Sequence, residues 1–474
     1  MVSTTMHFMP GCEILQSFDL VHWEHVTYVY ETLDHTDAQQ LKSGQNIYGQ
    51  GMWAASLRYH EGRFYICFVA NDTRKTYLYT SEKIDGPWKK QLIEGFYHDG
   101  SLLFDEDGRN YIVYGNDEIW ITELNEDLTA PKKDGLHRLL VSDHKNPELG
   151  YEGSHIQKIN GYYYIFLVHS LRDRWMRTEA CFYSDSLEGE FTGGDVLCDD
   201  RGYCGQGVAQ GGIVDTPDGK WYAMLFQDSG AVGRLPILLP VTWKDHFPVF
   251  GQNGHVPEEI EVHSTRPGYI YQPLVGSDDF CNGLLPRWQF NHDPDPRYYH
   301  LDALQGTYTI TTREVCTELT QAVNTLTQRM SYPSCAAEVT VDASALKEGD
   351  VAGLCALQGC YAAVGITKHH GKYEVLMLDK KEDGILDMTE GTVVESHQMD
   401  FRLEADFCNM KDEARCYYRV NKGDWLPIGT VHKLYFKLDH FTGCRFGLFC
   451  YAAEETGGSA CFRDFKYYDV DEIS

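Results

Sequence analysis

The stretch Gly150-Tyr-Glu-Gly-Ser-His-Ile-Gln-Lys-Ile-Asn-Gly-Tyr-Tyr-Tyr164 contains the unit from which the first half of this sequence is built. It predicts a short strand, an Asn-Gly hairpin turn and a second, aromatic strand. Glu152 stands at the start of the first strand among small residues, where a strand that only packs would carry a large apolar side chain. Taken alone this is a weak signal, because most glutamates at strand starts are solvated.

The signal gains weight because the unit recurs. Four turn glycines are each followed by aromatic residues and an apolar strand, at spacings of 46, 53 and 58 residues. They are Gly62, Gly108, Gly161 and Gly219. Repeats of this length are typical of propeller blades, and strand alternation with Gly, Asn and Asp turns replaces helical periodicity. The pattern therefore predicts an all-β chain that begins with a β-propeller.

One position of the unit is unusually polar. Nine residues before the four turn glycines stand Trp53, Asp99, Glu152 and Gln210. Since the first strands of propeller blades line the central channel, we expect these side chains to converge on the axis. An aromatic ring, two carboxylates and an amide suit a polar ligand better than an apolar core. The alternative is that they are ordinary polar residues at a turn-rich rim.

A fifth unit is present in part. Residues 1–6 predict a strand, and Ser17–Trp23 resembles the closing segment of the other units. The channel-lining strand and the turn glycine that should precede them are missing. We therefore predict a five-bladed propeller whose first blade is incomplete, and we expect the natural gene product to be longer.

Taken together, five elements resemble glycoside hydrolase family 43, of the β-xylosidase and α-L-arabinofuranosidase type. The elements are Ser3–Gly11, Trp53–Arg58, His98–Gly108, Tyr151–His155 and Gly233–Trp243. The resemblance implies an inverting, exo-acting hydrolase of β-xylosidic or α-L-arabinofuranosidic bonds in hemicellulose-derived oligosaccharides.

The resemblance also assigns roles. It makes Glu152 the general acid, Asp99 the residue that tunes the pKa of this acid, and Arg234 a contact to the sugar. We expect the enclosed site to keep Glu152 protonated near neutral pH. The general base of the family belongs to the missing strand, so it has no counterpart here. Because inversion needs both an acid and a base, a sugar-binding propeller without turnover stays open as the alternative.

Four more residues are expected at the sugar pocket. Phe8 resembles an aromatic wall of the family's pocket and Trp53 a platform for a sugar ring, although packing in a core is an equal alternative for both. His155 is expected to be a hydrogen-bonding partner rather than a proton carrier. Gln210 stands where many relatives have a histidine that organises a central water or cation. Because an amide is a poor metal ligand, no metal or cofactor is expected.

The second half of the sequence predicts a separate domain. A polar connector with prolines, residues 255–268, places the boundary between residues 265 and 266, giving domains 1–265 and 266–474. Short strands with Gly, Asp and Asn turns follow, which is typical of a β-sandwich. Trp288–Pro296 and Asn324–Arg329 resemble the concanavalin-like, lectin-like C-terminal sandwich of family 43 β-xylosidases. In that family a loop of this domain can close the pocket.

Composition narrows the partners and the compartment. The net charge of −29 argues against nucleic acid and anionic membranes and suits a neutral xylo- or arabino-oligosaccharide. Fifteen cysteines without a CxxC pair, several of them inside apolar strands, indicate reduced thiols and a cytoplasmic protein. A homo-oligomer is possible. A mixed-charge loop, expected at the rim, contains Arg172, Asp173, Arg174 and Arg177.

Overall fold

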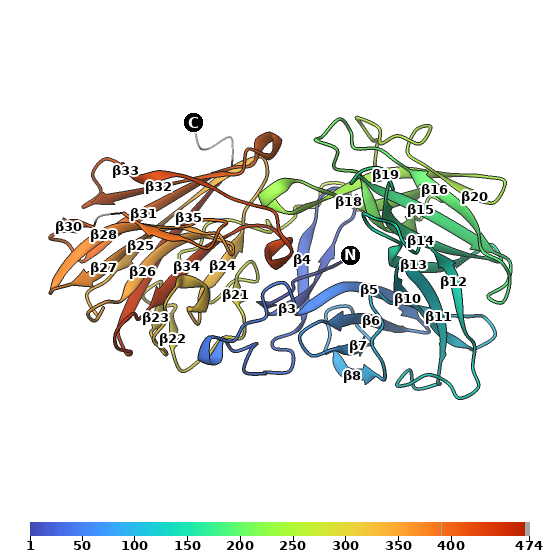
Figure 1. The fold of residues 1–474 in the computed structure, drawn as a ribbon, viewed down its shortest axis with the longest axis horizontal. Helices are drawn as coiled ribbons and strands as arrows, with labels where there is room; N and C mark the ends of the chain where they lie inside the picture. The colour runs from blue at the N-terminus through green and yellow to red at the C-terminus, as the bar shows by residue number, and fades with distance from the viewer. Residues whose placement is uncertain (390, 470–474) are drawn as a thin grey trace.

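The computed structural model describes residues 1–389 and 391–469, and shows two all-β bodies side by side (Figure 1). Helical structure within these residues is limited to short 3₁₀ turns. They are η1 (Lys42–Gly44), η2 (Gly230–Val232), η3 (Leu319–Gln321), η4 (Cys408–Met410) and η5 (Leu438–His440). The part of the chain that the structure describes holds no helix with the length and apolarity needed to cross a lipid bilayer.

The first body is a five-bladed propeller, as the repeat predicts. Each of its last four blades is an antiparallel sheet of four strands in chain order. The second blade is β5 (Met52–His60), β6 (Arg63–Ala70), β7 (Lys75–Ser81) and β8 (Lys89–Ile93). The third is β9 (Ser101–Phe104), β10 (Asn110–Asn116), β11 (Glu118–Leu124) and β12 (His137–Ser142). The fourth is β13 (Glu152–Ile159), β14 (Tyr162–Ser170), β15 (Arg177–Ser184) and β16 (Thr192–Leu197). The fifth is β17 (Ala209–Asp215), β18 (Trp221–Asp228), β19 (Arg234–Lys244) and β20 (Phe247–Phe250).

The first blade has one strand fewer, which confirms the prediction that it is incomplete. In the described residues it consists of β1 (Val2–Ser3), β3 (Gly11–Gln16) and β4 (Glu24–Tyr30). The first strands of successive blades contact one another, β5 with β9, β9 with β13 and β13 with β17, so they surround the channel.

A recurring irregularity shapes the start of these inner strands. One residue at each start adopts the left-handed conformation, and the ladders of β5, β13 and β17 shift register there. The left-handed residues are Ala54 (φ 33°), Asp99 (φ 49°), Gly153 (φ 68°) and Gln210 (φ 64°). A bulge of this kind bends the strand and redirects a side chain. In the third and fifth blades this residue is the repeat position itself, Asp99 or Gln210, and in the second and fourth blades it directly follows the repeat position, Trp53 or Glu152.

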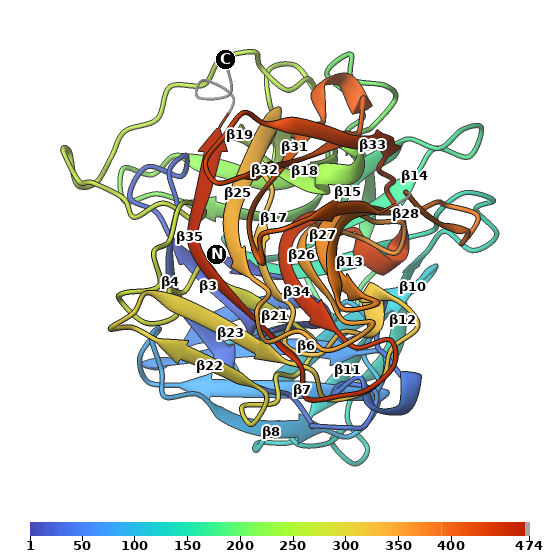
Figure 2. The same ribbon diagram turned by 90° about the vertical axis from the view of Figure 1, so that its left-hand side faces the viewer.

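The second body is a β-sandwich of a nine-stranded and a seven-stranded sheet, whose curved strands face the viewer in Figure 2. The larger sheet contains β2 (Phe8–Met9), β21 (Gln289–Asn291), β24 (Leu326–Arg329), β34 (Arg445–Tyr451), β26 (Val351–Leu357), β27 (Ala362–His369), β28 (Lys372–Lys380), β29 (Leu386–Met388) and β30 (Thr392–Val394). The smaller contains β22 (Tyr299–Asp302), β23 (Thr307–Thr311), β35 (Ser459–Asp469), β25 (Ser334–Asp342), β31 (Gln398–Asp406), β32 (Glu413–Val420) and β33 (Leu426–Lys433). Apolar side chains of both sheets share one core, including Leu354 and Val364 from one and Phe401 and Phe462 from the other.

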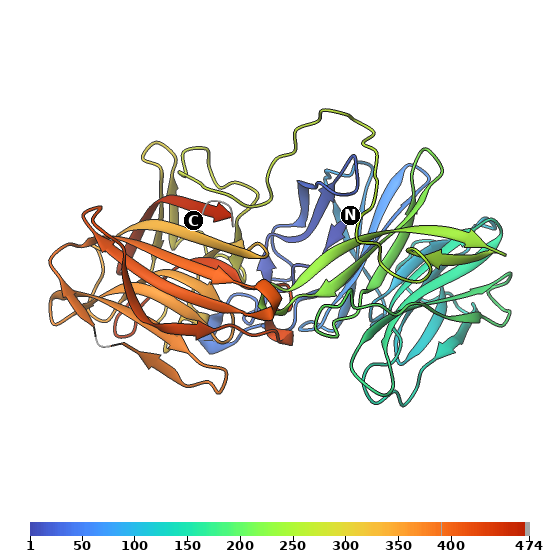
Figure 3. The ribbon, with the colours of Figure 1, turned by 90° about the horizontal axis from the view of Figure 1, so that it is seen from above.

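The two bodies exchange backbone. The N-terminal segment contributes β2 to the larger sandwich sheet, where Phe8 pairs with Asn291 and Met9 with Phe290. A strap of residues 251–276 returns from the fifth blade past the N-terminal strands to the sandwich, as Figure 3 shows from above, and the amide of Thr265 bonds the carbonyl of Phe18 at 2.8 Å. The boundary predicted at residue 265 falls within this strap and stays a prediction.

This exchange explains the position of Phe8. Its side chain is fully buried in a cluster of sandwich residues, and the Arg445 guanidinium lies 3.6 Å from its ring centroid. A ring enclosed on all sides presents no surface to a sugar. Phe8 therefore packs in a core, which was the alternative to its expected place in the pocket wall.

Three buried histidines meet beside Phe8, and we call them the histidine cluster: His7, His292 and His440. The His7 ring lies 4.9 Å from that of His292 and 5.2 Å from that of His440, and neither nitrogen of His7 has a hydrogen-bond partner among the described residues. Burial lowers the pKa of His7 far below its ordinary value and that of His292 to about 3. Folding therefore favours the neutral forms of His7 and His292.

Replacement of His7 by Phe should make the protein less sensitive to acid. The folded-state pKa of His7 is depressed, so its contribution to stability is complete above the unfolded value near 6.5 and is lost as the pH falls below it. At pH 5 one such histidine costs about 2 kcal/mol. The difference between urea midpoints at pH 7 and pH 5 should shrink in His7→Phe and stay unchanged in a control variant of an exposed histidine, His300→Phe. An undiminished difference in His7→Phe would contradict this account.

Candidate active site

The structure brings the two predicted carboxylates together at one end of the channel, and we call Asp99 and Glu152 the carboxylate pair. His98 lies between them, with its Nε2 3.7 Å from Asp99 Oδ2 and 3.8 Å from Glu152 Oε2. The Asn116 side chain donates to Glu152 Oε2 at 3.0 Å. The sequence analysis singled out neither His98 nor Asn116, although His98 directly precedes Asp99 in the repeat.

Backbone contacts between blades hold the pair in place. The amide of Gly153 donates to Asp99 Oδ2 at 3.0 Å, and Ser154 Oγ donates to the Asp99 carbonyl at 2.7 Å. A Cβ on Gly153 would come within 2.8 Å of the Gln210 side chain. The Gly-Ser after Glu152 is thus required for close contact with the third and fifth blades.

The charges around the carboxylate pair give Glu152 a lower pKa than the sequence analysis predicts. Burial raises the pKa of Asp99 to about 6. Burial also acts to raise the pKa of Glu152, but the facing imidazole of His98 and the charges of Arg177 and Arg234 outweigh it and hold this pKa below its ordinary value. The prediction that Glu152 is protonated near neutral pH is therefore wrong for this structure. The prediction failed because the sequence did not reveal which cationic side chains lie beside Glu152.

Two arginines stand at the same end of the channel and share one carboxylate, and we call Arg177, Asp228 and Arg234 the arginine clamp. Arg234 Nε donates to Asp228 Oδ1 at 3.1 Å, and Arg177 Nε donates to Asp228 Oδ2 at 3.0 Å. The guanidinium of Arg234 also lies 4.3 Å from the ring centroid of Phe226. The prediction that places Arg177 on a rim loop is wrong, since it opens β15 and is only 8% exposed.

The sandwich domain supplies one wall of the site. Phe441 follows η5, and its ring lies 5.3 Å from Trp53 and 4.4 Å from the Arg234 guanidinium. The approach is close, because a Cβ on Gly443 would lie 2.1 Å from the carbonyl oxygen of Val232. A residue more than 180 positions from the propeller thus completes a propeller site.

A cavity of about 100 Å³ lies beside Asp99 of the carboxylate pair. Its lining includes Asp99, His155, Gln210, Ser56 and Thr4. Burial lowers the pKa of His155 to about 3, so its ring is neutral at ordinary pH, in keeping with a hydrogen-bonding role.

The backbone of Gln210 is held by a hydrogen bond to the buried side chain of Glu179. Its amide donates to Glu179 Oε2 at 2.7 Å, and Glu179 is fully buried with no cation beside it. Burial raises the pKa of Glu179 well above its ordinary range, so this carboxyl is neutral. The sequence analysis did not identify Glu179, which lies inside the apolar strand β15.

One cluster among the described residues has metal-ligand spacing, namely His98, Asp99 and Glu152, whose ligand atoms all lie within 4.8 Å of one another. The carboxylates raise the pKa of His98 despite its burial, so the charged imidazole itself supplies the positive charge between them. This arrangement suits proton sharing.

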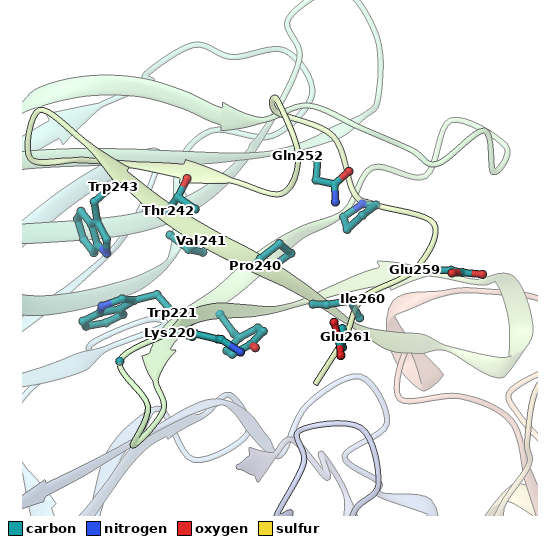
Figure 4. Close-up of a pocket in the computed structure, with 13 residues that line it drawn as sticks. Lys220, Trp221, Pro240, Val241, Thr242, Trp243, Gln252, Glu259, Ile260 and Glu261 are labelled. Atoms are coloured by element: carbon teal, nitrogen blue, oxygen red, sulfur yellow. The ribbon is translucent and has the colours of Figure 1, made fainter. Parts of the chain in front are cut away.

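A larger cleft of about 540 Å³ lies elsewhere, between the fifth blade and the strap (Figure 4). Trp221 and Trp243 stand at one end of it and Glu259 at the other. It contains none of the residues described above as site residues.

Comparison with known proteins identifies the family and the fold. Residues 1–248, more than half of the chain, match the model described as glycosyl hydrolases family 43. The chain belongs to glycosyl hydrolase family 43. Residues 277–468 match a second model, the β-xylosidase C-terminal concanavalin A-like domain.

Relatives with assigned names cover most of the chain. A β-xylosidase of Formosa agariphila is 25% identical over 533 residues, which is 99% of this chain and 85% of that protein. A non-reducing end α-L-arabinofuranosidase of Bacteroides ovatus is 24% identical over 326 residues, 65% of this chain and 59% of that protein. The solved structure of a bifunctional GH43-CE protein of Bacteroides eggerthii has 41% identity and a TM-score of 0.91 over 100% of this chain, which spans 61% of that one.

These relatives support the interpretation of this family 43 chain as a glycoside hydrolase over that of a binding protein without turnover. The general base has no assigned residue among those described. Asp34, which follows the first blade, has both carboxylate oxygens paired, Oδ2 with Lys75 at 2.6 Å and Oδ1 with Lys90 at 2.5 Å. Although burial acts to raise the pKa of Asp34, the hydrogen bonds from Lys75, Lys90 and Tyr77 outweigh it and lower this pKa to about 2, so Asp34 is a weak base.

Replacement of His98 by Gln should raise the pKa of Glu152, because the facing imidazole lowers it. If Glu152 is the acid that donates a proton, the alkaline limb of the kcat/KM–pH profile should move to higher pH in this variant. The exposed His144→Gln variant of the third blade is the control and should leave the limb in place. A limb that moves to lower pH in His98→Gln would refute the charge arrangement described here.

Proposed function

We propose that this chain removes terminal β-xylosyl or α-L-arabinofuranosyl residues from hemicellulose-derived oligosaccharides with inversion. The observation that carries the proposal is the carboxylate pair at the channel end, faced by the arginine clamp and closed on one side by Phe441. Two interacting carboxyls with different pKa values are the catalytic groups that glycosidases commonly use to protonate a glycosidic oxygen.

In the proposed reaction Glu152 protonates the glycosidic oxygen as the bond to the anomeric carbon breaks. Asp99 keeps the pair partly protonated up to about pH 6 and orients the Glu152 segment through the amide of Gly153. A sugar that covers the site removes further water from the pair, which raises the pKa of Glu152 and favours its protonated form. Water then attacks the opposite face of the sugar, and its proton passes to a base outside the residues assigned here.

The arginine clamp and the aromatic walls are proposed to position the sugar. Arg234 carries guanidinium donors that match sugar hydroxyls, and Trp53 with Phe441 provides apolar surface for the faces of a pentose ring. A wall contributed by the second domain blocks one direction along the channel end, which favours attack at chain ends over attack within a chain.

A second candidate is sugar binding without turnover. The observation that favours it is the pairing of both Asp34 oxygens with lysines, which leaves the base unassigned. It predicts affinity for xylobiose without release of xylose.

We further propose neutral oligosaccharides rather than nucleic acid or membranes as partners, a cytoplasmic location and a chain able to self-associate. The net charge of −29 and the fifteen cysteines, all free thiols in the structure, support the first two of these.

Replacement of Glu152 by Gln should reduce kcat for xylobiose and for methyl α-L-arabinofuranoside, whose leaving groups need a proton, by about 10²–10⁴-fold, the usual share of one acid–base group. The exposed Glu148→Gln variant should retain full activity. Proton NMR of the first product should show the anomer opposite to that of the substrate. Retention of configuration or an unchanged kcat in Glu152→Gln would exclude the proposed mechanism, and binding without turnover by the unaltered chain would support the second candidate.

Replacement of Phe441 by Ala should raise KM up to about tenfold, because it removes the ring that holds Trp53 and Arg234 at the site, and such aromatic contacts are worth about 0.5–1.5 kcal/mol. The matched control is Leu438→Ala in the same turn, whose side chain is 59% exposed and should not matter. The KM of both variants for xylobiose is measured by steady-state kinetics. Equal KM values in the two variants would show that the sandwich domain does not contact substrate.

A further inference from the structure

Arg177 raises a question that the ion pair with Asp228 does not answer. Asp228 is 2% exposed and already bonds Arg234, which neutralises it. A second guanidinium on the same carboxylate leaves the arginine clamp with one net positive charge, since two arginines face one aspartate. An unneeded buried cation is costly unless another group uses it.

The donors of Arg177 point to such a use. Only its Nε is engaged with Asp228, at 3.0 Å, and Nη1 is buried without a hydrogen-bond partner among the described residues. The side chain is held rigidly, with its guanidinium 5.2 Å from the Trp175 ring centroid and 5.6 Å from that of Phe226. A fixed guanidinium with a free edge is prepared to donate to an acceptor that is absent from the protein itself.

The strand pairing places Arg177 at the same end of the blade as Glu152. Arg177 pairs with Ser170 at the end of β14, and Glu152 pairs with Val168 two residues earlier, so both lie at the same end of the fourth blade. The charge of Arg177 also acts on Glu152. The unsatisfied donor therefore belongs to the same end of the channel as the carboxylate pair.

We propose that Arg177 is a second substrate-binding arginine, whose free guanidinium edge donates a hydrogen bond to a hydroxyl group of the bound pentose while Asp228 fixes it beside Arg234. This inference rests on the proposed function. It assigns to the substrate two neighbouring hydroxyls, one for each arginine, which is the pattern of an unsubstituted pentose at a chain end.

The main test is a kinetic comparison of Arg177→Met with the unaltered chain on 4-nitrophenyl β-D-xyloside. Loss of a hydrogen bond to a charged group should raise KM about 10- to 100-fold. The control is Arg174→Met in the turn before β15, because Arg174 is exposed and forms its ion pair with Asp173, another exposed residue. An unchanged KM in a folded Arg177→Met protein would overturn the proposal.

Deoxy substrates separate contact from mere structural support. Xylosides that lack the 2-, 3- or 4-hydroxyl should each be tested with both proteins. In the unaltered chain the loss of the contacted hydroxyl should raise KM, and in Arg177→Met the same loss should have no further effect. If all three penalties persist in the variant, Arg177 does not touch the sugar.

Further variants keep the test valid if Arg177→Met does not fold. Arg177→Lys preserves the charge beside Asp228 but lacks the guanidinium edge, so it should raise KM without moving the alkaline limb of the pH profile, and normal KM would refute the proposal. Titration of xylobiose into Glu152→Gln measures affinity without turnover. If the unaltered chain hydrolyses the substrate and the Arg177 variants match it, only this inference fails, whereas a chain that neither hydrolyses nor binds xylosides disproves the proposed function too.

Discussion

The structure depends on one backbone constraint, the left-handed residue at which each of four inner strands enters the channel. A bulge there turns a side chain toward the axis while the rest of the strand continues its ladder. In the fourth blade the residue is Gly153, but in the others it is Ala54, Asp99 or Gln210, for which this conformation costs about 1–2 kcal/mol each. Such strain persists only where neighbours stabilise it, as Gly153 does for Asp99 and Glu179 for Gln210.

The electrostatics of the site follow from this convergence. Once two carboxyls are forced to within reach of one imidazole, they cannot titrate independently, and the pair shares its protons as a unit. Arg177 and Arg234 of the arginine clamp add positive charge that lowers the pKa of Glu152. The elevated pKa therefore belongs to Asp99 in this structure, and the lowered pKa belongs to Glu152.

The two domains act as one unit for a related reason. The propeller gives β2 to the sandwich sheet, and the sandwich returns Phe441 to the propeller site. Between these contacts lies the histidine cluster, where burial favours the neutral forms of His7 and His292. The packing of the two domains and the shape of the site are thus linked. His440 of the histidine cluster lies in η5, and Phe441, which forms a wall of the site, directly follows it.

The sequence by itself determined the all-β class, the blade period and the register that picks out Trp53, Asp99, Glu152 and Gln210, because these are local patterns of strand and turn that repeat. It did not determine which distant side chains meet them. Arg177 and Asp228 are 51 residues apart and lie in different blades, and Phe441 comes from another domain. Nor did it reveal that Phe8 is enclosed or that Glu152 is surrounded by cations, because the burial of a residue and the charge around it depend on residues from the whole fold. Only the tertiary structure determines the burial and the local charge of each residue, and with them the pKa of each carboxyl and the shape of the site.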